Sequence, residues 1–458
     1  ILRRIDGLFI FIFAFLVRLV SIFFAGGFDS VLGYDDGVYY SASSAFNHGL
    51  VPYRDFVLVH PPGILFVLTP FTWISELTTD QIGFYCARLF FMVVGALSAW
   101  MIYRIGRRWS RGAGIAAALF YAVWMPVVRI ERTAYLEGLA ILFTLIALYI
   151  LFEKKRTQRY AVSIGLFLGL ATSLKIWYAV PVVVILLWLA LNKEFKRAFL
   201  IGLTSLTTFF AVSSYFIIKA GRRFFELVLY AQTQRAGEPI LILDRLEKIF
   251  NTESVNWVHS QNVSLVALLI ILALVSKYII DNVTNGESQL ILLLFIFQLA
   301  VLLKTPVFFN AYPSFIALSL ALIFGMVVAK LRSKTLIAAI MVFVIPVGLH
   351  SAFTQEPGRD LPNKIERLSF ASSRCVTSDS PAVLVLTNTL KRNLHNNCHM
   401  IFDVTGDIYS IDGGANRLHE NSTERQLHSR EYQKEVESYL VEGGVIIFYF
   451  RRVDCRCG

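Results

Sequence analysis

The sequence predicts an all-α polytopic membrane protein of roughly eleven transmembrane helices, with a small extracytoplasmic α/β domain at its C-terminal end. Three observations predict this class. Hydrophobic residues make up 56% of the 458-residue chain and charged residues only 16%, whereas soluble domains contain about 25% charged residues. Apolar runs of about 20 residues recur between short basic clusters, as in helical membrane proteins. The last hundred or so residues are polar and lack such runs.

The positive charge of the chain does not indicate a nucleic-acid partner. The formal net charge is +11, but Lys and Arg lie mostly in short segments between apolar runs, where they set the orientation of membrane helices. Five cysteines are too few for a disulfide-rich scaffold. The composition therefore excludes a soluble nucleic-acid-binding protein and a small disulfide-stapled domain.

The basic clusters also predict the orientation of the helices. Arg3 and Arg4 precede the first apolar run, so we expect the N-terminus in the cytoplasm. Each later cytoplasmic turn is basic under the same alternation, which leaves the C-terminal end outside. The expected spans are Leu8–Phe24, Phe84–Ile105, Gly114–Val127, Leu139–Phe152, Ala161–Ser173, Trp177–Leu191, Phe199–Ile218, Val263–Val275, Leu290–Leu303, Ser314–Ala329 and Leu336–His350.

A further apolar run, Pro61–Leu77, is expected to lie along the outer membrane surface and not to cross the membrane. The run is short, contains Pro70, and has Trp73 and Glu76 near its end. Counting it as a span would move the basic cluster Arg107–Arg111 to the outside, against the positive-inside rule.

The chain is expected to divide into a membrane domain, residues 1–352, and a soluble extracytoplasmic domain, residues 353–458. The membrane domain would carry two large outer loops, residues 25–83 and 219–262. The second of these loops is rich in arginine, against the positive-inside rule, which suits an anionic lipid headgroup. General attraction to the membrane surface would explain the same charge.

The soluble domain shows patterns of both strand and helix. We expect strands at Ala382–Leu386 and Val445–Phe450 and a helix at Glu431–Leu440. Cys375 and Cys398 can form a disulfide there, because the extracytoplasmic compartment is oxidising.

The polar stretch Gly33–Pro62 holds the strongest candidate site. Asp35 and Asp36 are followed by Tyr39 and Tyr40. One carboxylate raises the pKa of its neighbour, so the pair can supply a general base, and two acids also leave room for a divalent cation. The alternative is an acidic residue that starts a helix. Further candidate substrate-binding residues in this stretch are Arg54, Asp55 and His60.

Ionisable residues at the outer ends of later apolar runs are the next candidates. Arg132 and Glu137 lie before one run, where an acid also suits a helix N-terminus. Lys175 lies between two runs and can bind a phosphate, or simply extend to the membrane surface. Lys304 and Tyr312 can do the same, or form an ordinary aromatic belt. In the loop 219–262, the candidate is Arg235.

With these residues in view, the chain resembles the polytopic GT-C glycosyltransferases that use polyprenyl-phosphate sugars. Within them it is similar to the protein O-mannosyltransferase and aminoarabinose-transferase group. The specific part is an acid pair followed by a tyrosine, a Gly-x-x-Pro-Tyr-Arg-Asp turn and a Pro-Pro entry to an apolar helix, at Asp35–Tyr39, Gly49–Asp55 and His60–Pro62. Weaker matches extend the resemblance over most of residues 1–350: Arg88, Gly106–Arg108, Leu136–Glu137, Lys175 and Lys304–Pro313.

The chain departs from this family's pattern at two positions. Many relatives carry Asp-Glu where this chain has Asp35-Asp36, a mild chemical change. Many carry Lys-Pro-Pro where this chain has His60 before Pro61 and Pro62. A histidine titrates near neutral pH, so phosphate binding is expected to fall to other cations.

The resemblance implies an inverting transfer of a sugar from a polyprenyl-phosphate donor to an extracytoplasmic lipid, glycan or protein. Asp35 would deprotonate the acceptor hydroxyl, and Asp36 or Glu137 would orient the acceptor or the loop. The monophosphate donors of this group imply no metal, but the two acids leave room for a divalent cation, so the resemblance leaves this open. We expect a plasma membrane, in a bacterium, with its lipids around the protein. Tyr39 and Tyr40 would pack near the sugar, and the candidates for the phosphate are His60, Lys175, Arg235 and Lys304.

Two other classes of protein fit the same sequence. A transporter or flippase for a lipid-linked sugar would also need outer charges and many spans. It should show broken helices, repeats and charges in the middle of spans, whereas the charges noted here cluster at span ends. A non-catalytic assembly subunit would tolerate Asp35→Asn without any loss but stability.

Overall fold

A computed structural model describes residues 2–153, 157–233, 240–252, 286–331, 333–355, 357–359, 361, 373–411 and 426–447. Within them the chain is mostly helical, which confirms the predicted class. Contacts between residues divide the chain into two compact units. The first unit comprises Ile1–Ala25, Arg88–Ser214 and Glu238–Pro357. The second unit comprises Gly26–Ala87, Tyr215–Gly237 and Gly358–Gly458.

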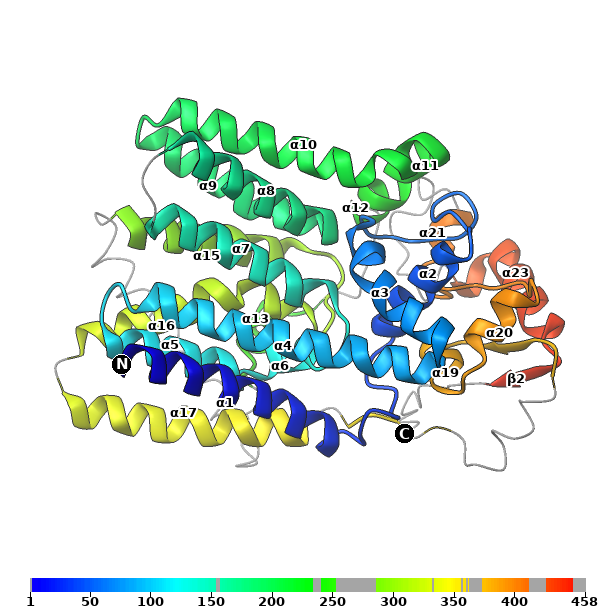
Figure 1. Ribbon diagram of the computed structural model, residues 1–458, viewed down its shortest axis with the longest axis horizontal. Coiled ribbons are helices and arrows are strands. Elements are labelled where there is room, and N and C mark those ends of the chain that lie inside the picture. Colours follow the sequence, from blue (N-terminus) through cyan, green and yellow to red (C-terminus); the bar gives the residue numbers. More distant parts are fainter. Residues whose placement is uncertain are drawn as a thin grey trace. The chain divides into compact units, whose positions relative to one another are not determined.

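The first unit is a bundle of apolar helices that run side by side in Figure 1. In lipid, a helix satisfies all its backbone hydrogen bonds internally, which is why apolar runs of this length become helices. The elements are α1 (Leu2–Phe24), α4 (Asp80–Gly106), α5 (Arg111–Val123), α6 (Met125–Glu131), α7 (Leu136–Glu153), α8 (Gln158–Leu174), η1 (Ile176–Tyr178), α9 (Ala179–Leu191), α10 (Phe195–Ala220), α13 (Ile242–Phe250), α15 (Gly286–Lys304), η4 (Tyr312–Ile316), α16 (Ala317–Lys330) and α17 (Lys334–Thr354). Helices α4 and α10 each extend into the second unit.

Six of the described helices are long and apolar enough to cross a membrane. A seventh is the pair α5 and α6, which bends by 65°. The bend falls at Trp124, whose backbone is extended, and Pro126 stands in the first turn of α6, where a proline fits without breaking hydrogen bonds. Three shorter apolar helices add to these, among them Gly63–Leu77. The expected span Val263–Val275 lies outside the described residues.

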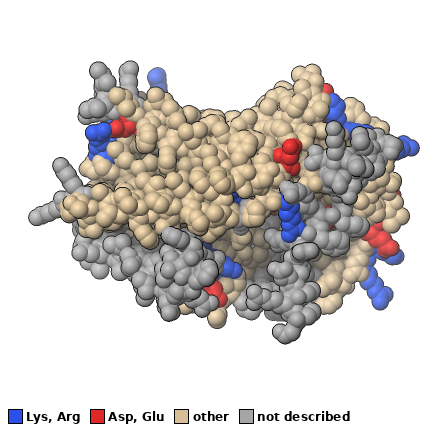
Figure 2. All heavy atoms as spheres, turned by 90° about the horizontal axis from the view of Figure 1, so that it is seen from below, with Lys and Arg blue, Asp and Glu red and all other residues tan. Residues whose placement is uncertain are grey.

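Large apolar side chains cover the outside of the first unit. Leu8 and Phe9 on α1 are 61% and 57% exposed, and Val342 on α17 is 72% exposed. Figure 2 shows a wide surface without charged side chains on one face of the structure. Large apolar side chains exposed on a face that carries few charges are unfavourable in water and suit the acyl chains of a bilayer. Together with the long apolar helices, it indicates a multi-pass membrane protein.

The second unit contains short helices and a two-stranded parallel sheet. Its elements are α2 (Asp35–Asn47), α3 (Gly63–Leu77), α11 (Arg222–Phe225), the π-helical turn η2 (Glu226–Tyr230), α12 (Ala231–Thr233), β1 (Val376–Ser378), α19 (Pro381–Leu386), α20 (Leu390–His395), α21 (Ile408–Ile411), α23 (Arg430–Glu442) and β2 (Val445–Ile447). Strand β1 pairs with β2, with Val376 opposite Val445. The expected helix at Glu431–Leu440 is confirmed, as is the start of the expected strand at Val445.

The strand expected at Ala382–Leu386 is wrong, because this segment is helix α19. Pro381 occupies its first turn, where its fixed φ favours a helix. The whole helix is buried and packs against α2. A Cβ on Gly37 would overlap the backbone of Ala382, so glycine at this position permits the close approach. Burial on all sides, and not alternation, explains the continuous apolar run.

Part of the expected outer loop 219–262 is also helical. It contains α11, the π-helical turn η2, α12 and α13. Helix α13 has Arg245 on its inner side, where the guanidinium donates to the carbonyl oxygens of Leu302, Leu303 and Thr305 at the end of α15. The arginine therefore compensates the exposed carbonyls of a helix C-terminus.

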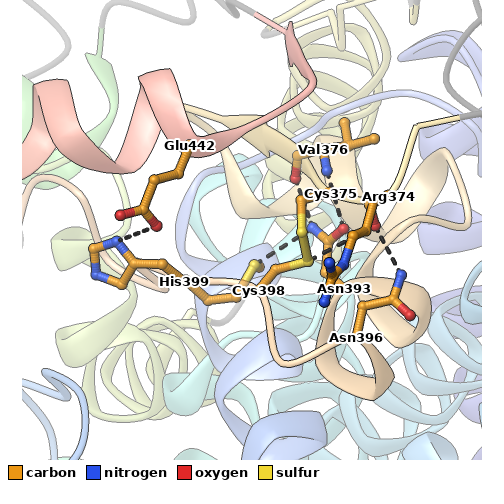
Figure 3. The surroundings of a disulfide bond; sticks show 9 residues. Arg374, Cys375, Val376, Asn393, Asn396, Cys398, His399 and Glu442 are labelled. Carbon is orange, nitrogen blue, oxygen red and sulfur yellow. Dashed lines mark hydrogen bonds and ion pairs between the residues drawn. A yellow bond between two sulfur atoms is a disulfide. The ribbon is translucent and has the colours of Figure 1, made fainter.

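The expected disulfide between Cys375 and Cys398 is present. Figure 3 shows its surroundings, where Asn393 holds β1 by both ends of its amide. Its Nδ2 donates to the carbonyl of Val376 at 2.6 Å, and the amide of Val376 donates to its Oδ1 at 3.0 Å. His399 forms an ion pair with Glu442 at 3.6 Å. The bond and this network fix α20 to the small sheet of the second unit.

Candidate active site

The acid pair lies in the first turn of α2, in the second unit. The helix begins at Asp35 and its N-cap is Tyr34 without a side-chain cap, so the alternative of an aspartate that caps a helix starting at Gly37 is not what the structure has, although the helix dipole favours both acids in the first turn. Asp36 is fully buried, and its Oδ1 accepts from the backbone amide of Gly37 at 2.9 Å. Asp35 is only half-buried. Of the two carboxyl groups, Asp35 is therefore the one that a substrate can reach.

The tyrosines and the histidine of this stretch lie in the interior of the second unit. Tyr39 meets His60 edge to face, with ring centroids 5.7 Å apart. Tyr40 is buried, and its hydroxyl contacts Ser75 Oγ at 2.5 Å and the carbonyl of Phe71 at 3.1 Å. Tyr40 therefore joins α2 to α3 and is committed to packing. Tyr39 and His60 belong to one aromatic contact.

Arg54 and Asp55 form an ion pair with each other at a turn. Arg54 Nε and Nη2 donate to Asp55 at 2.7 and 2.8 Å. Asp55 Oδ2 also accepts from the amide of Val51 at 2.7 Å, and the Arg54 guanidinium lowers the pKa of the Asp55 carboxyl. Tyr53, the buried residue that precedes this pair, has a φ of 67°. Its hydroxyl donates to the carbonyl of His60 at 2.7 Å. These contacts shape the turn and give the ion pair a structural explanation.

In the first unit, three of the predicted residues come together. Lys175 Nζ contacts Glu137 Oε1 at 2.5 Å. The same Nζ lies 4.8 Å from the ring centroid of Trp177 and 4.9 Å from that of Tyr312. The side chains of Lys175 and Glu137 are only 7% and 4% exposed. We call Glu137, Lys175, Trp177 and Tyr312 the lysine cluster.

A break between two helices positions the lysine of this cluster. Lys175 lies between α8 and η1, where its backbone is extended and not helical. Its side chain therefore does not continue the pattern of side-chain directions along α8. Glu137 lies in the first turn of α7, and α7 and α8 pack closely. Glu137 Oε2 is buried and has no hydrogen-bond partner among the described residues. A buried cation, two aromatic faces and an unused carboxylate oxygen can bind a polar group that reaches this cluster.

The remaining predicted residues are not part of the lysine cluster. Arg132 is buried and its Nη1 donates to Ser21 Oγ at 2.8 Å, so it joins α1 to the end of α6. Lys304 is exposed at the last residue of α15. Arg235 lies outside the described residues.

A second buried ion pair was missed by the sequence reasoning. Arg18 Nη2 contacts Glu131 Oε2 at 2.5 Å, and Tyr121 donates to Glu131 Oε1 at 2.6 Å. Arg18 stands inside the first expected span, so the expectation that charges occur only at span ends is wrong. The signal was an arginine in an otherwise apolar run, which must find a buried partner. The break between α5 and α6 was also unexpected.

Comparisons with known proteins were made for sequence and structure separately. Residues 59–218 match a family model for dolichyl-phosphate-mannose-protein mannosyltransferase. No curated protein sequence matches the chain.

Solved structures match most of the chain. ArnT from Cupriavidus metallidurans bound to undecaprenyl phosphate matches with a TM-score of 0.53 at 14% identity, over 84% of this chain and 77% of that one. The oligosaccharyltransferase AglB from Archaeoglobus fulgidus, in complex with an inhibitory peptide and a dolichol-phosphate, matches with a TM-score of 0.54 at 13% identity, over 80% of this chain. This chain spans only 57% of that AglB structure. At such identities, the likeness concerns the fold.

Proposed function

We propose that this chain, a multi-pass membrane protein with the GT-C fold, is a glycosyltransferase that moves a sugar from a lipid-phosphate donor to an extracytoplasmic acceptor. The observation that carries this proposal is the structural match to ArnT, which extends over 84% of the chain and includes a bound undecaprenyl phosphate in that structure. The partial match to a mannosyltransferase family model supports the same reaction class. The AglB structure, an oligosaccharyltransferase, likewise holds a lipid phosphate, a dolichol-phosphate.

In this proposal Asp35 is the general base. Its carboxylate accepts the proton of the acceptor hydroxyl, the hydroxyl oxygen bonds to the anomeric carbon, and the bond from that carbon to the phosphate oxygen breaks. The electron pair leaves with the lipid phosphate. Asp35 is suited to this role because it is half-buried at the start of α2, whereas Asp36 is fully buried and accepts from the amide of Gly37. Asp36 would orient the turn that carries Asp35.

The lysine cluster is our candidate for the phosphate. Negative charge grows on the leaving phosphate in the transition state, and a cation already fixed in a site shielded from water stabilises that charge strongly. Lys175 is fixed by Glu137 and by the faces of Trp177 and Tyr312. A bound phosphate must compete with Glu137 for Lys175, so Glu137 would set how tightly the donor is held.

The disulfide Cys375–Cys398 supports an outer location for the second unit, because disulfides persist in oxidising compartments. The acceptor would then be a lipid, glycan or protein outside the cytoplasm. We still expect the membrane that holds this protein to be a bacterial plasma membrane. A divalent cation held by Asp35 and Asp36 belongs to the same proposal, and recovery of transfer when Mg²⁺, which prefers oxygen ligands, is added back to chelated protein tests it.

The class of reaction is tested by direct transfer. Purified protein in nanodiscs would receive a panel of radiolabelled polyprenyl-phosphate sugars with a membrane extract as acceptor. We expect label from one donor to move into product. Transfer would also be measured in Lys175→Met, which removes the cation of the lysine cluster. Lys304→Met would be compared with it, because Lys304 is exposed and outside the lysine cluster. If no donor is consumed but labelled lipid crosses the bilayer of proteoliposomes, the protein is a transporter and the proposal fails.

A further inference from the structure

Two histidines and a glutamate meet in the second unit, away from the acid pair. His48 Nε2 lies 3.5 Å from Glu76 Oε1, and His395 Nε2 lies 3.3 Å from Glu76 Oε2. One ligand atom from each of the three side chains lies within 4.8 Å of the others. The two imidazole rings are 5.0 Å apart at nearly a right angle. The three residues come from the end of α2, the end of α3 and the end of α20.

The surroundings prepare His48 to act as a ligand. Its Nδ1 contacts the carbonyl oxygen of Ser44 at 2.8 Å. A carbonyl only accepts, so Nδ1 is the donor in this contact, and Nε2 on the other side of the ring faces Glu76. Histidine ligands of metals are typically held in this way by a backbone carbonyl. Glu76 Oε1, on the side of His48, is a buried atom without a hydrogen-bond partner among the described residues. Apart from the imidazole of His48 at 3.5 Å, this buried oxygen has no neighbouring donor among the described residues.

We propose that His48, Glu76 and His395 form a binding site for a divalent transition-metal ion, of which Zn²⁺ is the best match. Two imidazole nitrogens and one carboxylate are ligands that zinc takes, with water in the remaining position. Hard ions such as Mg²⁺ prefer oxygen ligands only. The site thus selects its metal by its two nitrogen donors.

The location of this site indicates a structural role. His48 follows the last residue of α2, whose first turn carries the acid pair. A helix of 13 residues is about 20 Å long, so a metal at His48 is remote from Asp35. The ion would tie α2 and α3 to α20, beside the disulfide of Cys398. It would act as a second cross-link of the same unit.

One neighbouring residue, Lys391, disfavours a cation at this site and provides a further test. Lys391 Nζ lies 3.6 Å from Glu76 Oε2. The same ammonium donates to the carbonyl of Ser75 at 3.2 Å and that of Glu76 at 2.6 Å, at the end of α3. Its positive charge repels a cation at the site. Lys391→Met should therefore raise the affinity for Zn²⁺, whereas a merely structural cluster of hydrogen bonds would gain nothing.

The experiment uses the full chain in nanodiscs, stripped with a chelator and titrated with Zn²⁺ alone. Calorimetry should show one ion per chain, and the apparent melting temperature should rise. His395→Ala should weaken binding by more than about tenfold. Its side chain is 55% exposed, so the fold is expected to survive. His399→Ala is the matched control, because His399 also pairs with a glutamate, Glu442, but belongs to no group of three such ligands among the described residues.

Co²⁺ gives an independent readout through its visible absorption, which reports tetrahedral nitrogen and oxygen ligands. The absorption should disappear in His48→Ala and His395→Ala and persist in His399→Ala and Asp35→Asn. Equal binding by wild type and His395→Ala would overturn the proposal, as would no binding at micromolar Zn²⁺. Loss of binding in Asp35→Asn alone would move the metal to the acid pair and also overturn it.

Discussion

The two units of this protein keep their charges in different ways. In the first unit two ion pairs, Arg18–Glu131 and Lys175–Glu137, are buried, with side chains at most 7% exposed. In the second unit the pair Arg54–Asp55 is exposed at a turn. That unit is instead held by a disulfide and by hydrogen bonds between side chains and backbone.

The difference follows from the surroundings of each unit. A charge among apolar helices cannot be hydrated, so it persists only with a fixed partner, and removing the partner is costly. An exposed pair is screened by water and contributes little. The buried charges of the first unit should therefore be sensitive to single substitutions, whereas the second unit should be sensitive to the loss of its covalent and buried contacts.

The largest effect is expected at Glu131. Glu131→Ala leaves Arg18 buried without its partner and removes the acceptor of Tyr121. We expect a loss of about 3–5 kcal/mol in the free energy of unfolding, measured by thermal unfolding in detergent. Asp6→Ala is the control in the same unit, because its partner Arg111 is 59% exposed. Equal losses in both variants would contradict the comparison.

The second largest effect is expected for Lys175→Met, and it concerns activity. We expect kcat to fall by about 10²–10³-fold, the cost typical of losing one electrostatic stabiliser of a transition state. Lys175→Arg should retain part of the rate, because it keeps the charge. Turnover with a consumed donor measures this effect. A fall in stability with no change in kcat would assign the lysine cluster to structure alone.

The disulfide should contribute next. Cys375 and Cys398 are 23 residues apart, and closing a loop of that length stabilises a protein by about 3 kcal/mol. Cys375→Ser should lower the apparent melting temperature of the second unit. The matched control is Cys86→Ser, since Cys86 is a free cysteine. If reduction of the wild type leaves its unfolding unchanged, the second unit does not depend on this bond.

A smaller effect concerns pH. Burial and the nearby acids Glu435 and Asp403 raise the pKa of Asp407 to about 7. Because the folded state holds this proton more tightly than the unfolded state, the stabilisation is complete below about pH 4 and is lost as the pH rises through about 7. The apparent melting temperature should therefore be higher at pH 5 than at pH 8. Asp407→Asn should flatten this dependence, and Glu437→Gln, on the exposed side of α23, should not.

The sequence predicted the elements that local rules control. Apolar runs became helices, and the helix at Glu431–Leu440 and the disulfide Cys375–Cys398 were confirmed. It failed where tertiary contacts decide. The run at Ala382–Leu386 has the composition of a strand, but Pro381 and burial against Gly37 make it helical.

For the candidate site, the sequence suggested individual residues but not the contacts between them. A charged residue before an apolar run suggested Glu137 and Lys175, but nothing in their spacing showed that they pair or that Tyr312 lies beside them. Arg54 and Asp55, predicted as binding residues, also form an ion pair with each other, which their positions in the sequence did not indicate. Partners 38 and 113 residues apart in the chain are brought together by packing, which the sequence does not encode locally.

The measurement that tests the account most directly compares sugar transfer by the wild type with transfer by Asp35→Asn. Both would be assayed with the donor that the wild type consumes, after their melting temperatures and disulfide content have been shown to agree. Glu437→Gln would be the matched control. We predict that Asp35→Asn abolishes transfer while donor binding persists. Transfer by Asp35→Asn at the wild-type rate would contradict the assignment of the acid pair as the catalytic base.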